Sequence, residues 1–274
     1  MNRDQATVDG FGDEWRRFDQ AGVADAELAA LFAAYFAVFP WDALPPDAVG
    51  FDLGCGSGRW ATQVAPRVGH LHAIDPAADA LAVARAKLAA HANVTTHLAS
   101  VDAIPLVDGT MDFGYSLGVL HHVPDTARGL ADCVRKLKPG APFLLYLYYA
   151  FDNRPWWFRQ VWRASDVVRR GVSRLPSGGR YAVSQALATG VYWPLARTAR
   201  VLDRLGLDVE RLPLSAYRER SFYVMRNDAL DRFGTRLEHR FTRAEMQAVM
   251  EGAGLERVRF HDGVPFWTAV GYRR

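Results

Sequence analysis

The sequence contains few cysteines and no long apolar run, and each of these two shortages narrows the class of protein. Only Cys55 and Cys133 are present in 274 residues, far apart, which argues against a disulfide framework or a metal site and favours a reducing compartment. The longest apolar run, residues 28–39, has twelve residues, whereas a membrane-spanning helix needs roughly 20. The first residues also lack the pattern of a secretory signal. We therefore expect a cytoplasmic protein without membrane insertion.

The charges are distributed unevenly along the chain. The formal net charge is only +3, and half of the residues are hydrophobic, which excludes a disordered chain. Residues 151–240 hold 17 Arg, no Lys and nine acidic residues, for a charge of +8, whereas the remainder holds 16 basic and 21 acidic residues, for −5. This overall balance is too small for a dedicated nucleic-acid binder, so no nucleic-acid partner is expected.

The order of apolar strands and Ala-rich helices predicts an α/β fold. We expect strands at residues 49–53, 71–75, 94–98, 111–116, 142–149, 255–261 and 266–272 and helices at 59–67 and 77–91. A capping box, Thr242 with Glu245, predicts a further helix that begins there. This order predicts a doubly wound, mostly parallel seven-stranded sheet of the Rossmann-like class. The domains expected are an N-terminal helical lid (1–45), the Rossmann-like core (46–150 and 241–274) and a helical cap inserted after the fifth strand (151–240).

A glycine-rich turn follows the first predicted strand, in Asp52-Leu53-Gly54-Cys55-Gly56-Ser57-Gly58. Glycines suit a turn at which a ligand must approach the backbone closely. The turn alone is ambiguous, because it also satisfies a loose dinucleotide fingerprint. Asp75 and Asp102 follow the next two strands. Since the carboxyl ends of parallel strands share one edge of a sheet, three carboxylates are expected beside this turn.

At these residues the sequence resembles the class I S-adenosylmethionine-dependent methyltransferases, over about 49–150 and 241–274. The matching motifs are 52–58, the strand end at Asp75, Asp102, residues 111–125 and Lys136-Leu137-Lys138-Pro139-Gly140. The resemblance implies S-adenosylmethionine as the cofactor, with Gly54 and Gly56 at its methionine part, Asp52 at its ammonium group, Asp75 and Pro76 at ribose, Asp102 and Ala103 at adenine, and Leu117 near the sulfonium. It also implies a methyltransferase acting on a small-molecule acceptor, through O- or N-methylation.

Two adjacent histidines follow the fourth predicted strand and are candidates for a catalytic base. His121 and His122 are expected to border the methyl donor, and imidazole titrates near neutral pH. The alternative is that one or both rings only pack the loop. Tyr148, at the end of the fifth predicted strand, is expected to face the acceptor, with core packing as the alternative.

The arginine-rich segment 151–240 is expected to determine the acceptor. Within it, Tyr217, Arg218 and Tyr223 are the predicted acceptor contacts. Arginine with aromatic residues also suits RNA, so methylation of RNA or protein is the alternative function. A cofactor-using enzyme that transfers no methyl group is a further alternative. Trp15, near the start, is expected either to cover the donor or to pack on the sheet. A monomer or a homodimer is expected.

Overall fold

The computed structural model describes residues 2–274 and divides the chain into two compact units. The core unit comprises the described residues up to Gln20 together with Ala29–Ala150 and Leu237–Arg274. The helical unit comprises Ala21–Leu28 and Phe151–Arg236. The chain therefore leaves the core unit twice, briefly after Gln20 and again after the fifth strand, and returns for the last time before the last helix.

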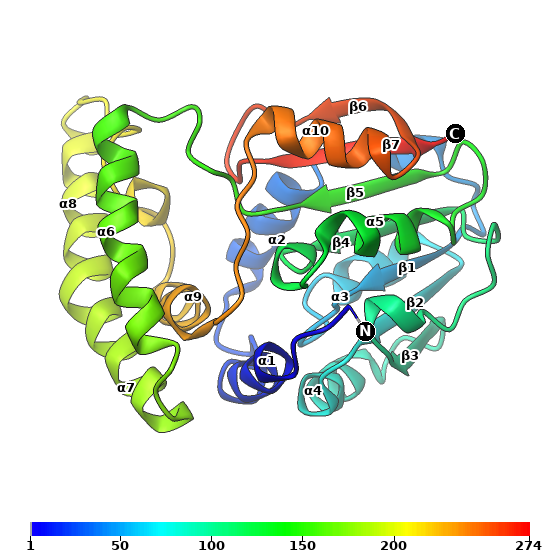
Figure 1. The fold of residues 1–274 in the computed structure, drawn as a ribbon, viewed down its shortest axis with the longest axis horizontal. Coiled ribbons are helices and arrows are strands. Elements are labelled where there is room, and N and C mark those ends of the chain that lie inside the picture. Colours follow the sequence, from blue (N-terminus) through cyan, green and yellow to red (C-terminus); the bar gives the residue numbers. More distant parts are fainter. Residues whose placement is uncertain (1) are drawn as a thin grey trace. The chain divides into compact units, whose positions relative to one another are not determined.

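The core unit contains a seven-stranded sheet in the order β3-β2-β1-β4-β5-β7-β6 (Figure 1). The first five strands are parallel, and β7 runs antiparallel to both β5 and β6. The strands are β1 (Val49–Leu53), β2 (His70–Asp75), β3 (Val94–Leu98), β4 (Phe113–Leu117), β5 (Pro142–Tyr146), β6 (Leu255–Phe260) and β7 (Thr268–Arg273). The predicted fold class, a doubly wound and mostly parallel Rossmann-like sheet, is confirmed.

The helices of the core unit follow the predicted alternation with the strands. They are α1 (Gln5–Arg17), α2 (Asp25–Tyr35), which begins in the helical unit, α3 (Ala61–Val64), α4 (Ala78–Leu88), α5 (Thr126–Val134) and α10 (Arg243–Gly252). The α1 helix packs on α4, and α5 packs on α10. At the start of α10 the Thr242 hydroxyl accepts from the Glu245 N–H while the Glu245 carboxylate accepts from the Thr242 N–H. The predicted capping box is therefore confirmed.

The central strands β1, β4 and β5 are buried on both faces, as expected of parallel strands covered by helices. Phe51, Phe113, Tyr115 and Phe143 are fully buried in this layer. Asp52 is the exception, since it places a carboxyl group inside the apolar sheet. An ionisable group in this position requires a physical explanation, because burial of an isolated charge is costly.

Several predicted strands differ from the observed ones at their ends. The strand predicted at 142–149 ends at Tyr146, after which Tyr149 forms only an isolated bridge with Phe241. The strand predicted at 266–272 begins at Thr268, and the helix predicted at 59–67 is the short α3 followed by a 3-10 turn (Ala65–Arg67). Pro66 in that turn cannot donate the backbone hydrogen bond that a longer helix requires.

The helical unit has a small apolar core of its own. Its helices are α6 (Trp156–Val172), α7 (Ser177–Leu187), α8 (Trp193–Arg204) and α9 (Phe222–Gly234), and a π-helical turn joins α7 to α8 (Figure 1). Its core consists of Val172, Ala188, Tyr192, Ala196, Met225, Ala229 and Phe233. Both α6 and α7 contact α9, so the unit is organised around that helix.

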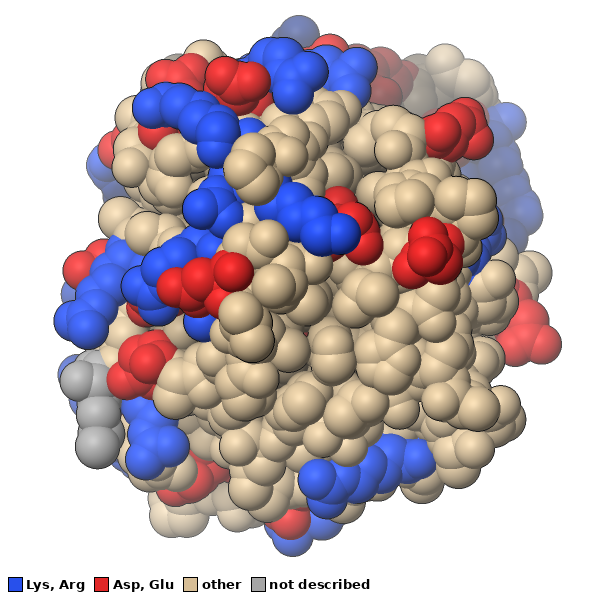
Figure 2. Space-filling model, turned by 90° about the vertical axis from the view of Figure 1, so that its right-hand side faces the viewer, with Lys and Arg blue, Asp and Glu red and all other residues tan. Residues whose placement is uncertain are grey.

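Among residues 2–274, no helix is long and apolar enough to cross a membrane. The same residues contain no group of three or more His, Cys, Asp or Glu side chains arranged to hold a metal ion. The face drawn in Figure 2 carries Lys and Arg side chains interspersed with Asp and Glu around a broad uncharged area. This face shows no continuous field of one charge.

Candidate functional site

The glycine-rich turn connects β1 to α3 at the carboxyl edge of the sheet. Gly54 has φ +78° and Gly56 has φ +53°, in the left-handed region that favours glycine. A Cβ added to Gly54 would lie 2.3 Å from a methyl carbon of Val119. The Gly54 N–H donates to the Ile74 carbonyl oxygen over 2.7 Å. Both the backbone conformation and the neighbouring side chain therefore require glycine at position 54.

Asp75, the last residue of β2, fixes the shape of this turn. Its Oδ2 accepts from the Gly56 N–H over 2.9 Å, and its Oδ1 accepts from the Ala77 N–H over 2.8 Å, across Pro76. Burial raises the pKa of Asp75 to about 6, although these two backbone donors act in the opposite direction. Asp75 is thus placed at the predicted edge. Its contact with ribose stays a prediction.

Asp52 is the most unusual group in the core unit. It lies within β1, and its Oδ2 is buried without a hydrogen-bond partner among the described residues. Burial raises the pKa of Asp52 to about 8, against the effect of the neighbouring Tyr115 hydroxyl and Arg59, and nearby Asp75 raises it further. A buried carboxyl with an unused oxygen beside a glycine turn fits a ligand that brings a cationic group. The residues present therefore suit the ammonium group of S-adenosylmethionine.

Asp102 lies in a 3-10 turn (Val101–Ala103) after β3 and is held by the N-terminal segment. Its carboxylate accepts from the Ser100 hydroxyl and, over 2.8 Å, from the Asn2 N–H. These two donors hold the pKa of Asp102 below its usual range. Asn2 also exchanges two hydrogen bonds, of 2.7 and 2.8 Å, with the backbone of Asp125. Hydrogen bonds therefore hold Asn2 beside Asp102 and Ala103, the residues predicted to contact adenine.

The N-terminal helix α1 covers the glycine turn. A Cβ added to Gly56 would lie 2.9 Å from the indole of Trp15, and the Arg59 guanidinium lies 5.7 Å from the Trp15 ring centroid. On the same helix, Phe11 lies 5.0 Å, centroid to centroid, from the His122 ring. The sequence left Trp15 either over the donor or against the sheet. The structure places its indole against Gly56 of the glycine-rich turn, and its covering of a donor stays a prediction.

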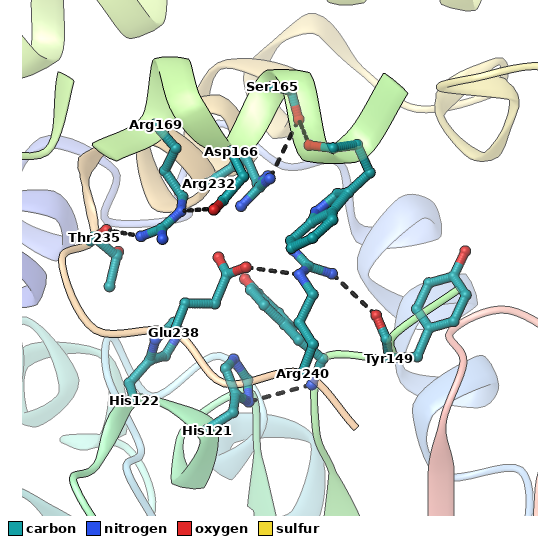
Figure 3. Close-up of polar contacts among 12 residues, drawn as sticks. His121, His122, Tyr149, Ser165, Asp166, Arg169, Arg232, Thr235, Glu238 and Arg240 are labelled. Atoms are coloured by element: carbon teal, nitrogen blue, oxygen red, sulfur yellow. Dashed lines mark hydrogen bonds and ion pairs between the residues drawn. The ribbon is translucent and has the colours of Figure 1, made fainter. Parts of the chain in front are cut away.

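The two predicted histidines lie together in a 3-10 turn (Leu120–His122) that follows Leu117, the last residue of β4 (Figure 3). Their ring centroids are 4.0 Å apart, and His121 stacks on Tyr148 at 3.8 Å. His121 Nδ1 accepts weakly from the Tyr148 N–H over 3.4 Å, and its Nε2 is buried without a hydrogen-bond partner among residues 2–274. Burial, together with His122 and Arg240, holds the pKa of His121 well below its usual range.

His122 has the complementary hydrogen-bond pattern. Its Nδ1 lies 2.7 Å from the carbonyl oxygen of Leu237. Because a carbonyl oxygen only accepts, Nδ1 carries the proton in the neutral ring, and Nε2 presents the lone pair. The structure therefore brings His121, His122 and Tyr148 into one cluster. The hydrogen bonds assign opposite tautomers to the two histidine rings.

A segment that the sequence analysis missed forms one wall of this cluster. Residues 237–241 run beside the turn after β4 and the end of β5, with the His239 N–H donating to the His121 carbonyl oxygen over 2.9 Å. Within the segment, Arg240 Nε pairs with Glu238 Oε1 at 2.6 Å, with side chains only 12% and 2% exposed (Figure 3). The Arg240 guanidinium carbon lies 5.0 Å from the Tyr148 ring centroid. The cluster thus contains a buried ion pair as well as two imidazoles.

The remaining predicted acceptor residues contact other parts of the helical unit. Tyr217 packs on Tyr192, with ring centroids 5.5 Å apart. Arg218 pairs with Asp203 at 3.0 Å on the surface. The Tyr223 ring fills the space beside Gly22, 2.6 Å from where a Cβ would stand. These contacts give each residue a structural role within its own unit, and their contact with an acceptor stays a prediction.

Residues 51–140 match the family model described as "Methyltransferase domain". The comparison identifies a methyltransferase domain within this segment of the chain. The chain is 31% identical over 106 residues to phosphoethanolamine N-methyltransferase 2 of Caenorhabditis elegans. This alignment covers 38% of this chain and 24% of that protein. It is 29% identical over 152 residues to 2-phytyl-1,4-naphtoquinone methyltransferase of Trichormus variabilis, covering 52% of this chain and 65% of that protein.

The structural comparison agrees with the fold. An S-adenosylmethionine-dependent methyltransferase from Thermotoga maritima superposes with a TM-score of 0.50 at 14% identity, covering 96% of this chain and 100% of that chain. The chain matches less than two thirds of the length of the curated relatives named here. Methyltransferase domains of this class use S-adenosylmethionine, and the matched segment of this chain contains Asp52, Gly54, Gly56, Asp75 and Asp102.

Proposed function

We propose that this protein transfers a methyl group from S-adenosylmethionine to a small-molecule acceptor. The observation that carries the proposal is the buried, unpaired Oδ2 of Asp52 beneath a turn that only glycine can form. A buried carboxyl of this kind is costly unless a ligand compensates it. The methyltransferase domain matched over 51–140 supplies the chemical class of that ligand.

In this proposal the donor is held along the carboxyl edge of β1 to β4. Its methionine part lies against Gly54 and Gly56, with Asp52 facing the ammonium group. Asp75 and Pro76 contact the ribose, Asp102 and Ala103 contact adenine, and Leu117 lies near the sulfonium. When bound, S-adenosylmethionine supplies an electrophilic methyl group, so the chain contributes mainly the position of the acceptor.

His122 is the better placed of the two imidazoles to act as a general base. The carbonyl of Leu237 holds the proton on Nδ1, which leaves the Nε2 lone pair to take a proton from an acceptor hydroxyl or ammonium. His121 has the opposite pattern, since its Nδ1 already accepts from Tyr148. His121 therefore keeps its proton on Nε2 and can donate a hydrogen bond to the acceptor.

The acceptor side favours a compact, partly aromatic molecule. Tyr146 and Tyr148 lie near His121, and Tyr35 packs edge-on against Tyr146 with ring centroids 5.0 Å apart. Aromatic walls with a few fixed polar groups are typical of small-molecule sites. The two named relatives act, by their names, on phosphoethanolamine and on a naphthoquinone, so the family likeness leaves the methylated atom to experiment.

Calorimetry with S-adenosylhomocysteine tests donor binding directly. We expect saturable binding by the unmodified chain. Asp75→Ala should weaken it about 100-fold, because the change removes hydrogen bonds to a charged acceptor and releases the turn. The matched control is Asp47→Ala, an exposed aspartate outside the site. Absence of binding, or equal affinity in the Asp75→Ala variant, contradicts the proposal.

The arginines of the helical unit favour a second candidate, methylation of RNA. The segment 151–240 carries +8, and phosphate contacts give binding that weakens steeply with salt. A salt-sensitive complex with tRNA, and methyl transfer to it, would favour this candidate over a small acceptor. Mass spectrometry after incubation with the cofactor alone distinguishes both from an enzyme that cleaves the cofactor without an acceptor.

A further inference from the structure

The helix α6 has a solvent-facing side that combines exposed apolar residues with arginines. Trp156 is 70% exposed and Val167 71%, and Trp157, Val161 and Val168 are exposed as well. We propose that this face of α6 docks on the surface of an anionic lipid bilayer. The inference goes beyond the proposed methyl transfer and does not depend on it.

The exposed apolar residues form one stripe along the helix. At 100° per residue, Trp156, Trp157, Val161, Val167 and Val168 lie within an arc of about 140°. Trp162, on the opposite side of the helix, packs within the helical unit, and Val172, at the edge of the stripe, belongs to the unit's apolar core. Helix α6 therefore has two apolar sides. One packs within the helical unit, and the other is exposed to solvent.

A row of arginines borders this stripe. Arg159, Arg163, Arg170 and Arg174 are exposed and occupy the adjacent arc of about 60°. The single acidic residue of α6, Asp166, is buried beside this row and pairs with Arg169 at 2.6 Å and Arg170 at 2.8 Å. Asp166 therefore neutralises part of the row, and Arg159, Arg163 and Arg174 remain as exposed cations along the stripe.

This combination fits a bilayer surface better than the other occupants. Tryptophan and aliphatic side chains enter the boundary between headgroups and acyl chains, while arginine contacts anionic headgroups. In a symmetric dimer with antiparallel α6 helices, each arginine row would lie against its copy and repel it. RNA would pair with the arginines but would leave Val161, Val167 and Val168 without apolar contact.

A second group of exposed apolar residues lies on and beside α8 of the same unit. Val191 precedes α8, Leu195 and Val201 lie on it and Leu205 follows it, and all four are exposed. Large exposed apolar patches mark interaction sites. The α8 residues add to the apolar area of the unit, but the α6 face alone joins it to a row of arginines and is the face that the experiment addresses.

Vesicle flotation tests the proposal with the full chain. Vesicles of phosphatidylcholine alone are compared with vesicles that also contain phosphatidylglycerol, at about 0.1 M and about 0.5 M salt. We expect binding only to the anionic vesicles and release at high salt. Val167→Ser and Arg163→Gln should each weaken the partition coefficient about fivefold, because each removes an apolar or a basic contact.

Two matched controls separate a specific face from general stickiness. Val107→Ser changes a valine of the core unit that is 72% exposed, and Arg128→Gln changes an exposed arginine on α5. Both should bind as the unmodified chain does. The proposal is overturned if anionic vesicles do not bind, if the controls lose as much binding as the α6 variants, if tRNA binds through this face in place of vesicles, or if light scattering shows a dimer that Val167→Ser dissociates.

Discussion

The two units treat ionisable side chains in opposite ways. The core unit buries Asp52, Asp75 and His121 at the edge of its sheet and leaves one oxygen of Asp52 and one nitrogen of His121 without hydrogen-bond partners among residues 2–274. The helical unit buries Asp166 only together with Arg169 and leaves its other arginines exposed or half-buried. A buried group with an unused atom is suited to meet a ligand, whereas an exposed row of like charge is suited to meet a surface.

The apolar side chains show the same contrast. In the core unit Phe51, Tyr115 and Phe143 are fully buried, whereas in the helical unit Trp156 and Val167 are largely exposed. Folding removes the first group from water and leaves the second group to whatever binds there. The core unit is therefore the part suited to hold a ligand, and the helical unit is the part suited to bind a surface. The following substitutions test each half of this contrast.

The largest effect is expected for Gly54→Ala in the donor turn. The new Cβ would lie 2.3 Å from Val119 at φ +78°, so we expect a loss of about 3 kcal/mol in stability and about 100-fold in donor affinity. Gly140→Ala is the control, because Gly140 has φ +80° with no atom within 4 Å of the new Cβ. It should cost only about 1 kcal/mol and leave binding intact. Calorimetry and urea denaturation measure both, and equal losses in the two variants contradict the steric argument.

A smaller but still large effect is expected for Arg240→Met in the wall of the histidine cluster. The change removes the guanidinium partner of Glu238 from a largely buried pair and should cost about 3 kcal/mol. Adding Glu238→Gln should recover much of that loss, since the buried charge is then gone. For comparison, Lys138→Met breaks the exposed pair with Asp112 and should cost less than about 1 kcal/mol. A double variant no more stable than Arg240→Met contradicts the pair's role.

The sequence predicted the strands, the glycine-rich turn and the capping box because the signals for these features are local. The strand 49–53 has the predicted ends, and Asp75 is the last residue of β2, as the pattern of an apolar run ending in a carboxylate indicated. Turn glycines, strand ends and a capping box are each determined by residues a few positions apart. This is why the fold class and the position of the glycine-rich turn follow from the sequence.

The histidine cluster was predicted through His121, His122 and Tyr148, but its wall was missed because the contacts of that wall join distant residues. Segment 237–241 lies beside His121 and Tyr148 through hydrogen bonds between residues about a hundred positions apart, and no local period marks them. The same holds for Asn2 and Asp102, joined at 2.8 Å. The available signal was composition, since Glu238, His239 and Arg240 are adjacent just before the capping box.

The next effect concerns the proton on Asp52. Its pKa is raised from 3.8 to about 8, so the folded chain holds this proton at pH 7, and the stability it contributes is present below pH 4 and lost as the pH rises through 8. When the ammonium of S-adenosylhomocysteine faces the carboxylate, about one proton should leave. Calorimetry at pH 7 in buffers of different ionisation enthalpy measures it. Asp52→Asn should abolish the release and flatten the pH dependence of stability, while Asp47→Asn should change neither. Equal proton release by Asp52→Asn and the unmodified chain contradicts the assignment.

The smallest effect is expected on the outward side of the helical unit. The test is whether a substitution there leaves the free energy of unfolding nearly unchanged. Val201 on α8 is 57% exposed, so Val201→Ser should change the free energy of unfolding by less than about 0.5 kcal/mol. The same substitution at Val172, 7% exposed on α6, removes an apolar side chain from the unit's core and leaves a hydroxyl there, at a cost of about 2 kcal/mol. Thermal denaturation compares the two. Equal destabilisation would mean that the exposed apolar side chains stabilise the fold. It would contradict the contrast in which the helical unit exposes apolar side chains for binding and the core unit buries them.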